Sequence, residues 1–449
     1  MSRFSRRGYA KQSWQNWSGS VQARPRQIVR PVTIDELAKR LGSYGAEGRH
    51  VRVVGAGHSF TPLVQSNDIL MSLDKIQGIE AIDREEMTVT VSGGTRLKKL
   101  GEQLHGLGLA QENLGDIDLQ SIAGAISTGT HGTGTRFGSI STQVVGLTLV
   151  TATGEVLECS PERDPDLFKA AQVSLGTLGV IAKVKLRVVP ARRMQLRSQR
   201  AQLSDCLSNL ERYKQENSHF TFFWLPYTET VRTKFMNETE AEATGSKLWG
   251  TFTEIVVDNG VTWLLSECCR RVPSWSAAIS NISAQAISSV NKVDYSHRLF
   301  AMTLLVRIQA MEYLIPAEYF TTVIAEIQEC IKRERFAVHV PIECRFVHAD
   351  DIWLSPAYHR DSASVAVHMS KGMAYQEYFQ HMEEIFRRYQ GRPHWGKMHT
   401  QDAASLSELY PRWYDFQRVR SRLDPQGMFL NDYVRELFDA DGTLPTENE

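Results

Sequence analysis

The sequence has few cysteines, and they do not form the patterns that hold small folds together. Six cysteines are scattered over 449 residues, with no C-x-x-C pair and no partnered histidine at a zinc-ligand spacing. A disulfide framework or a structural zinc site is therefore not expected, and we expect no metal ion in the functional site. The same pattern favours a reducing compartment, so the cytoplasm is the expected location.

An excess of charge of one sign and a long apolar run are also missing. Lys+Arg and Asp+Glu both number 51, and a net charge of zero gives no basic field for a nucleic-acid partner. No apolar run reaches the roughly 18 residues of a transmembrane helix. The basic residues 1–7 are not followed by the apolar core of a signal peptide. These absences leave peripheral contact with a membrane surface open.

The length and the changing composition of the chain predict two domains, since 449 residues are more than a single hydrophobic core usually organises. Up to residue 190, short strand patterns alternate with helices, for example a strand at 87–92 and a helix at 96–105. A capping box at 33–36 predicts another helix, which Gly45 can close. Residues 191–391 are poorer in glycine and carry long helical patterns at 204–216 and 318–334. Residues 392–449 return to short polar motifs.

The most informative motif is a β-branched strand at 51–54 that runs into a turn with two glycines and a histidine. Gly55 and Gly57 allow backbone N–H groups to converge on an anion, because glycine tolerates a positive φ. A dinucleotide-binding Rossmann turn needs a third glycine where Phe60 stands, and Pro62 argues against a helix there. Alone, the motif fits a structural turn as well as a cofactor loop.

Two further loops have a similar composition. Residues 121–134 hold four glycines and five small hydroxyl residues, with apolar residues that anchor the segment in a core. Residues 174–181 form a third small-residue turn. Three such loops between strands favour one long phosphate-bearing cofactor over three unrelated turns.

Two charged residues are expected on one face of a strand at 341–347. Glu343 and Arg345 are two positions apart, so their side chains point the same way. A buried Glu/Arg pair is more often structural than catalytic. Because the other face of this strand is apolar, however, the pair is expected to converge on one cavity.

A lysine and a histidine are further candidates. A lone lysine is usually a solvated surface charge, but Trp395 and Gly396 beside Lys397 suggest partial burial. His368 alternates with apolar neighbours on an expected strand. It is therefore either a satisfied core histidine or a functional base.

These motifs carry a resemblance to a known family. In order and spacing, the three loops, the Glu-x-Arg pair, and residues 392–397 and 424–433 resemble the vanillyl-alcohol oxidase flavoprotein superfamily. Over nearly the whole chain they resemble its sugar-lactone oxidases: L-gulono-1,4-lactone and D-arabinono-1,4-lactone oxidases or dehydrogenases, near alditol oxidase. The resemblance implies an α+β, two-domain fold with a PCMH-type FAD-binding domain at 1–190 and a mixed-sheet substrate cap at 191–391. Residues 392–449 would return to the FAD domain.

The implied activity is FAD-dependent oxidation of an aldono-1,4-lactone. Hydride would pass to flavin N5, and O2 or another acceptor would reoxidise the flavin. The expected partners are a small sugar lactone or polyol and this electron acceptor. The alternatives are an alditol oxidase and a flavin-binding protein without turnover, although binding alone would not need the four charged or basic groups above.

The resemblance also assigns residue roles. His58 is the expected covalent attachment point for the 8α-methyl group of the flavin; the alternative is a histidine beside non-covalent FAD. Glu343 and Arg345 would bind substrate hydroxyls and the flavin pyrimidine edge. Lys397 and His368, in interchangeable roles, would accept the hydroxyl proton. The other expected cofactor-binding residues are Val54, Gly55, Ala56, Gly57, Ser59, Gly115, Asp116, Ser121, Gly124, Ser127, Thr128, Thr130, His131, Gly132, Gly179, Ile181 and Asn431.

Two residues depart from the alditol oxidase pattern, which has Ala-Ser where this chain has Gly115 and Asp116. The serine contacts the polyol in alditol oxidase, so Asp116 points to a different substrate and favours lactones. Gly115 would leave space at the flavin edge that meets oxygen, which favours oxidase behaviour.

Overall fold

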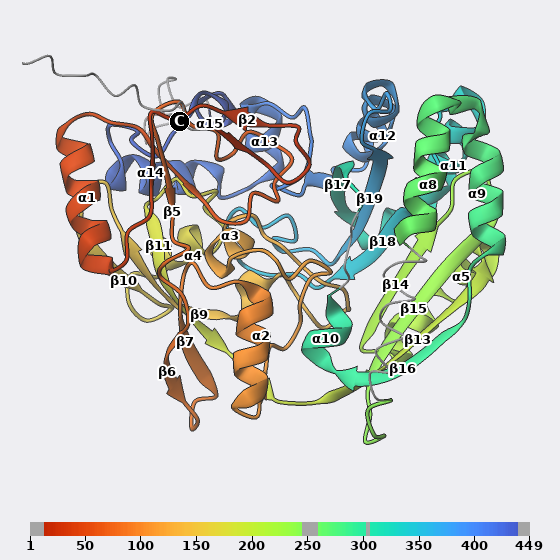
Figure 1. Cartoon of the computed structure of the whole chain (residues 1–449), viewed down its shortest axis with the longest axis horizontal. Helices are drawn as coiled ribbons and strands as arrows, with labels where there is room; N and C mark the ends of the chain where they lie inside the picture. The colour runs from red at the N-terminus through yellow and green to blue at the C-terminus, as the bar shows by residue number, and fades with distance from the viewer. Residues whose placement is uncertain (1–12, 245–258, 302–305, 439–449) are drawn as a thin grey trace, which may run out of the picture.

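The computed structural model describes residues 13–244, 259–301 and 306–438. The segment weighed above as a signal peptide, residues 1–7, lies outside this part. Two units lie side by side, a first unit with its own small sheets and a cap unit built on one large sheet (Figure 1). Within the described residues, no helix is both long and apolar enough to cross a membrane.

The first unit contains a parallel three-stranded sheet and an antiparallel five-stranded sheet. The order of the first is β3 (Gln27–Val29), β5 (Ile69–Ser72), β4 (Val51–Val54). The order of the second is β10 (Val156–Cys159), β9 (Val144–Val150), β11 (Val180–Arg187), β7 (Thr88–Ser92), β6 (Ile79–Asp83). Short pairs join β1 (Trp14–Gln15) to β2 (Gln22–Ala23) and β8 (Leu109–Ala110) to β12 (Val189–Pro190).

Two helices of the first unit were predicted, and both begin within one residue of the expected start, whereas α3 (Ile122–Ser127) lies inside the segment 121–134 that was expected to be a loop. In α1 (Ile34–Ala46), Thr33 Oγ1 accepts a hydrogen bond from the Glu36 backbone N–H at 3.1 Å, which confirms the predicted N-terminal cap. The helix continues past Gly45 by one residue. The others are α2 (Leu97–Gly106), α3 (Ile122–Ser127), α4 (Pro165–Gln172) and the 3₁₀ turn η1 (Ile140–Gln143).

The cap unit is built on an eight-stranded sheet. Its order is β16 (Val290–Tyr295), β13 (Arg193–Gln202), β15 (Thr230–Glu238), β14 (His219–Trp224), β18 (Ile342–Val347), β19 (Ser362–Ser370), β17 (Ile308–Pro316), β20 (Arg392–Pro393). The expected fold class is confirmed, but the mixed sheet is not, because every pair among these strands is antiparallel. Hairpins and helical crossovers return the chain to strands that run in opposite directions.

Helices cover one face of the cap sheet. They are α5 (Leu203–Ser208), α6 (Leu210–Glu216), α8 (Asn259–Arg271), α9 (Ser276–Gln285), α11 (Phe320–Glu334) and α12 (Gln376–Arg388), with 3₁₀ turns η3 (Pro273–Trp275) and η4 (Ala317–Tyr319). The short helix α10 (Ser296–Phe300) lies instead between the two units, against α2 (Figure 1). Buried residues of α11 and α12 share one apolar core with Cys344, Val367 and Tyr313 of the sheet. The single helix expected at 204–216 is divided at Asn209, whose side chain donates to the Asp205 carbonyl.

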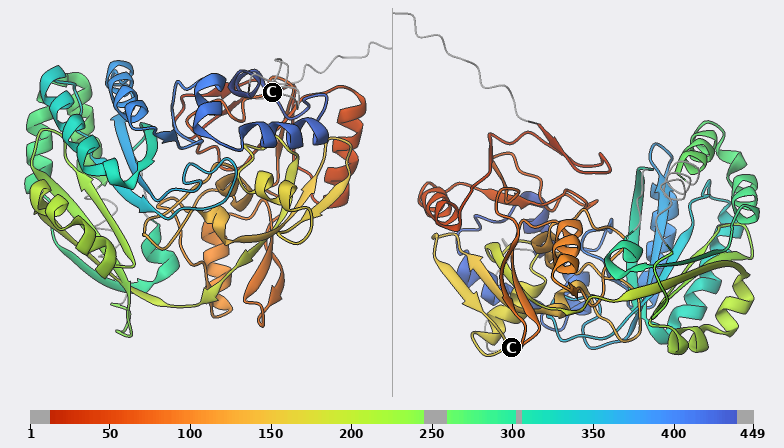
Figure 2. Two further views of the ribbon diagram at one scale, coloured as in Figure 1. Left: turned by 180° about the vertical axis from the view of Figure 1, so that it is seen from behind. Right: turned by 60° about the horizontal axis from the view of Figure 1, so that its bottom comes forward.

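The C-terminal segment connects the two units. It starts as β20 at the edge of the cap sheet and continues into α13 (Ala403–Leu409), α14 (Trp413–Leu423) and α15 (Asp432–Phe438). Trp413, Phe416 and Phe438 join the core of the first unit, and α14 lies beside α4 (Figure 2).

Candidate functional site

A cavity opens between the three small-residue loops of the first unit. Of the expected cofactor-binding residues, those on its lining are Val54, Gly55, Ala56, Gly57, His58, Ser59, Ser121, Gly124, Ser127, Thr128, Gly179 and Ile181. Gly93 and Gly94, which follow β7, also line it. The three loops therefore form one elongated cradle.

Close backbone packing explains the glycines of this cradle. A Cβ atom on Gly55 would lie 2.2 Å from Ser121 Oγ, so the first loop can touch the second only without a side chain there. Gly57 adopts a φ of +68°, the left-handed conformation that favours glycine. A long ligand that contacts the backbone fits such a surface.

His58 lies at the end of the cradle. Its ring stacks on Trp17 with 5.5 Å between centroids, and it borders a second cavity next to α2 and α10. Burial, Lys397 and Arg96 lower the pKa of His58 to about 4, so the imidazole is neutral at pH 7. Its Nδ1 atom is buried and has no hydrogen-bond partner in the described part of the chain. A neutral, unpaired ring nitrogen is available for a ligand.

The His58 loop and the Lys397 segment, far apart in sequence, lie side by side. The Phe60 backbone N–H donates to the Gly396 carbonyl at 2.8 Å. Lys397 Nζ lies 5.2 Å from the centroid of the Phe60 ring. The fold thus brings the lysine from the C-terminal segment to the end of the cradle.

One face of the cap sheet carries the polar candidates. Glu343 of β18 pairs in register with Ala366 of β19, which pairs with Glu312 of β17. Cross-strand partners point to the same face, so both carboxyl groups lie on the side opposite the helices. His368 and Arg345 follow at alternate positions of the same face. The expected shared face of Glu343 and Arg345 is confirmed.

Arg345 bridges two carboxyl groups. Its Nη2 donates to Asp116 Oδ2 and to Glu343 Oε1, each at 2.5 Å, and Lys234 Nζ lies 3.8 Å from Asp116 Oδ1. Burial and the nearby Asp116 charge raise the pKa of Glu343 to about 8, although Arg345 opposes this. For Asp116, burial is outweighed by Arg345 and Lys234, which lower its pKa to about 2. At neutral pH the two carboxyl groups carry one proton, on Glu343.

One ring nitrogen of His368 is committed to the backbone, and no hydrogen bond from the described residues occupies the other. Its Nδ1 lies 3.0 Å from the Pro341 carbonyl, which only accepts, so Nδ1 carries the proton. Burial and Lys397 lower the pKa of His368 to about 4, against smaller effects of the Pro341 hydrogen bond and of Glu312. Its Nε2 lone pair can therefore accept a proton.

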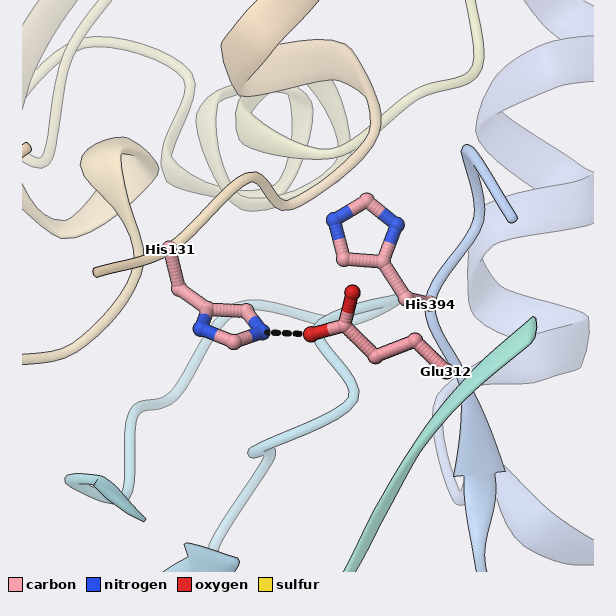
Figure 3. A group of neighbouring side chains, drawn as sticks. All are labelled: His131, Glu312 and His394. Carbon is pink, nitrogen blue, oxygen red and sulfur yellow. Dashed lines mark ion pairs between the residues drawn. The ribbon is translucent and has the colours of Figure 1, made fainter. Parts of the chain in front are cut away.

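Glu312 was not among the sequence candidates, yet it lies at the centre of the polar face. His131 and His394 flank its carboxylate (Figure 3). His131 Nε2 is 3.0 Å from Glu312 Oε1, and Lys397 Nζ is 3.6 Å from Oε2. Burial would raise the pKa of Glu312, but His131 and Lys397 outweigh it and hold the pKa well below its usual range.

The remaining expected residues lie around the cradle but not on its lining. A Cβ on Gly115 would meet the His131 carbonyl at 3.1 Å, so the space expected beside Gly115 is largely taken by backbone. Thr130 and Gly132 belong to the same buried loop as His131. Asn431 Nδ2 donates to the Pro62 and Gln65 carbonyls at 2.8 Å each, and thereby fixes the loop that follows His58.

The sequence did contain some indication of the missed residues. Glu312 is the one carboxylic residue in β17, whose nine residues are all buried, and such a carboxyl needs partners. Lys234 and Trp17 lie in ordinary strand and loop sequence. Only the fold brings them to Asp116 and His58.

Comparisons with known proteins agree with this geometry. A family model described as D-arabinono-1,4-lactone oxidase matches residues 184–437, and one described as an FAD binding domain matches residues 25–160. The chain is 40% identical to L-gulono-1,4-lactone dehydrogenase of Mycobacterium tuberculosis over 94% of this chain and 98% of that protein. It is 31% identical to L-gulonolactone oxidase of Scyliorhinus torazame over 95% of this chain and 98% of that protein.

A solved structure resembles the whole fold. A mutant form of cholesterol oxidase from Brevibacterium sterolicum superposes with a TM-score of 0.81 at 18% identity, over 96% of this chain and 97% of that chain. At this identity the similarity shows a shared fold, namely the arrangement of the first unit and the cap unit.

Proposed function

The chain belongs to the D-arabinono-1,4-lactone oxidase family, and from that premise we propose that it is an FAD-dependent enzyme that oxidises an aldono-1,4-lactone. The substrate is of the L-gulono- or D-arabinono-1,4-lactone type, and electrons pass on to O2 or another acceptor. The observation that carries this proposal is the convergence of Glu343, Arg345, His368 and Lys397 on one sheet face beside the His58 loop. Binding alone would not need proton-transfer groups there.

The residues of the cradle fit FAD. Its glycines leave backbone exposed to a long phosphate-bearing ligand, and His58 provides a neutral ring nitrogen at one end. When bound, FAD supplies the hydride acceptor at its N5 atom. We propose that the 8α-methyl carbon of the flavin is bonded to a ring nitrogen of His58, which the unpaired Nδ1 atom supports.

The cap residues divide the substrate chemistry among them. We assign His368 Nε2 as the acceptor of the hydroxyl proton, because its other nitrogen is held at Pro341 and the ring is neutral. Lys397, paired with Glu312, orients the same hydroxyl as an ammonium group. Glu343, protonated at neutral pH, can donate to a ring oxygen or hydroxyl, while Arg345 holds it in place.

Six free cysteines support a reducing compartment for this enzyme, and we place it in the cytoplasm. Fractionation of cells tests this location, and a fraction that sediments with membranes and is released by salt would show peripheral attachment.

Anaerobic reduction of the purified holoenzyme tests the proposed activity. L-gulono-1,4-lactone or D-arabinono-1,4-lactone should bleach the visible flavin absorbance, whereas xylitol and sorbitol should not. Preferential bleaching by the polyols would favour an alditol oxidase instead. Absence of bleaching by every compound would contradict an enzymatic role on these substrates.

Acid precipitation tests the covalent bond separately. Flavin should stay with the precipitated wild-type protein and be released from the His58→Ala variant. The Trp17→Phe variant, which keeps the histidine, is the control and should retain flavin as the wild type does. Release from the wild type would show that the bond is not formed.

A further inference from the structure

Glu312 is buried in the middle of β17, yet it is surrounded by donors. Ser364 Oγ donates to Oε1 at 2.6 Å, and His131 Nε2 lies 3.0 Å from the same oxygen. Lys397 Nζ lies 3.6 Å from Oε2. A buried carboxylate without such partners would cost several kcal/mol, so these contacts keep it ionised.

The donors come from three separate parts of the fold. His131 belongs to a loop of the first unit, Ser364 to the neighbouring strand β19, and Lys397 to the C-terminal segment. The ring of His131 is fixed through its Nδ1, which lies 2.9 Å from the Gly132 carbonyl, so that its Nε2 faces the carboxylate. One carboxylate therefore joins both units at the place where the lysine is presented.

A metal ion is the other occupant that a His-Glu-His group suggests, since ligand atoms of His131, Glu312 and His394 lie within 4.8 Å of one another. Two contacts argue against it. The Gly396 backbone N–H already donates to His394 Nδ1 at 3.0 Å. The Lys397 ammonium already supplies a cation beside the Glu312 carboxylate.

We propose that Glu312 is a positioning residue for lactone oxidation, whose carboxylate fixes the Lys397 ammonium and the His131 ring at the reacting face of the cap sheet. This inference rests on the proposed function. Its consequence is that Glu312 sets both the place of Lys397 and the local charge at His368.

The charge has a defined direction of effect. Glu312 opposes the lowering of the His368 pKa by burial and Lys397. Loss of that negative charge alone lowers the pKa of His368, but the displacement of the Lys397 ammonium that Glu312 holds raises it by more, since Lys397 has the larger effect. The charged and titratable groups that face Glu312 from the surrounding elements are His131, His394, Lys397, His368, Asp116, Glu343 and Arg345.

The test compares Glu312→Gln with Glu383→Gln in the holoenzyme. Glu383 is equally buried and accepts from Thr400 Oγ1 at 2.6 Å, but contacts neither Lys397 nor His131 through any described hydrogen bond or ion pair. In Glu312→Gln, the maximal rate of flavin reduction by lactone should fall about tenfold or more. The acid limb of the pH profile should move to higher pH by up to about one unit, because the displaced Lys397 ammonium lowers the pKa of His368 more than Glu312 raises it. In Glu383→Gln the limb should stay in place.

A crystal structure gives a readout besides activity. Lys397 should leave its wild-type position in Glu312→Gln and keep it in Glu383→Gln. If Glu312→Gln does not fold, the Glu312→Asp variant provides the test. It keeps the negative charge, but its shorter side chain places the carboxylate farther from Lys397. The rate of flavin reduction should therefore fall, while the acid limb of the pH profile stays in place. A wild-type rate and limb in either Glu312 variant would overturn the inference, as would a stoichiometric metal ion in the wild type that Glu312→Gln loses.

The same experiment separates two failures. A wild type that no lactone reduces contradicts the proposed function itself. A wild type that is reduced, with a Glu312→Gln variant indistinguishable from it, contradicts only the role of Glu312.

Discussion

Asp116 and Glu343 place two carboxyl groups on the guanidinium of Arg345, and burial decides which of them keeps a proton. Asp116 has a second cation nearby in Lys234, whereas Glu343 has Arg345 beside it together with the negative charges of Asp116 and Glu312. The pKa values therefore move apart, to about 2 for Asp116 and about 8 for Glu343. Two residues of similar chemistry thus acquire different roles, one as a fixed anion and the other as a proton donor.

This separation predicts how stability depends on pH. Between about pH 4.5 and about pH 8 the folded Glu343 stays protonated while the unfolded one ionises. The folded state then binds more protons, so the contribution of Glu343 to stability falls as pH rises through this window. As pH rises from 5 to 8, the free energy of unfolding of Glu343→Gln should increase relative to that of the wild type by on the order of 2 kcal/mol. Thermal unfolding at several pH values measures it.

Asp116→Asn provides the control for this pH effect. It removes the negative charge that raises the pKa of Glu343, so the gain from Glu343→Gln in that background should shrink. A stability difference between wild type and Glu343→Gln that does not change with pH would contradict a protonated Glu343.

Lys397 offers a second prediction at this scale. Replacing the ammonium by an apolar chain in Lys397→Met should slow flavin reduction by lactone about 100-fold or more. FAD content should not change, because Lys397 does not line the cradle. Rapid-mixing absorbance under anaerobic conditions measures the rate, with the exposed Lys371→Met as the control. A full reduction rate in Lys397→Met would remove this lysine from the proposed chemistry.

Single residues were predictable where a local pattern places them. The two-residue spacing of Glu343 and Arg345 on a strand was sufficient to put them on one face. Glu312 was not found, because its partners come from residues 131, 364 and 397, and strand order cannot be read from periodicity. Asp116 was found through the resemblance, but its pairing with Lys234 depends on the fold.

At the scale of elements, Arg52 of β4 ties the loops of the cradle together. Its guanidinium donates to the carbonyls of Leu63 at 2.7 Å, Leu175 at 2.8 Å and Gly176 at 3.1 Å, and also to that of Phe429. These carbonyls belong to the first loop, the third loop and the C-terminal segment. Burial lowers the pKa of Arg52 to about 10, so it stays charged at neutral pH.

Arg52→Met should therefore weaken both the fold and the cradle. Four buried carbonyls lose their donor, and the expected loss in the free energy of unfolding is about 3 kcal/mol or more. FAD affinity should fall with it, because two of the three loops are released. Denaturant unfolding and flavin titration measure the two effects.

Arg49→Met is the matched control for Arg52. Arg49 pairs with Asp68 in a partly exposed salt bridge, and its loss should cost no more than about 1 kcal/mol. Equal losses in the two variants would argue that Arg52 has no special role in the cradle.

Helices and strands with strong local sequence patterns were predictable. Features that depend on competing hydrogen bonds or on the connections between strands were not. The capping box of α1 and the alternation of β7 both appear where expected. The break between α5 and α6 was missed because Asn209 offers its own side chain to a backbone carbonyl, a choice that helical periodicity does not reveal. The antiparallel cap sheet was missed because strand direction depends on the connections.

At the scale of the whole molecule, function requires the cradle of the first unit to face the polar side of the cap sheet. The loop at 131–134 makes this contact. Thr133 Oγ1 donates to the Phe220 carbonyl of β14 and accepts from the Phe346 N–H of β18 at 3.2 Å. The Gly134 N–H donates to the Phe346 carbonyl at 2.8 Å. These hydrogen bonds between the loop and the cap strands thus align His131 with Glu312.

Thr133→Val should separate cofactor binding from turnover. It keeps the shape of the side chain but leaves one buried carbonyl and one buried N–H unpaired, at an expected cost of about 2 kcal/mol in unfolding free energy. Because Thr133 does not line the cradle, FAD content should stay near wild type. Flavin reduction by lactone should fall about tenfold, since a small shift of the sheet misplaces its proton-transfer groups.

Thr142→Val is the control. The Thr142 hydroxyl donates to the Ser139 carbonyl within the first unit, so its loss should leave the rate unchanged. If instead FAD content and reduction rate fall together in Thr133→Val, the two units are not aligned independently of the cofactor, and the loop at 131–134 belongs to the cradle itself.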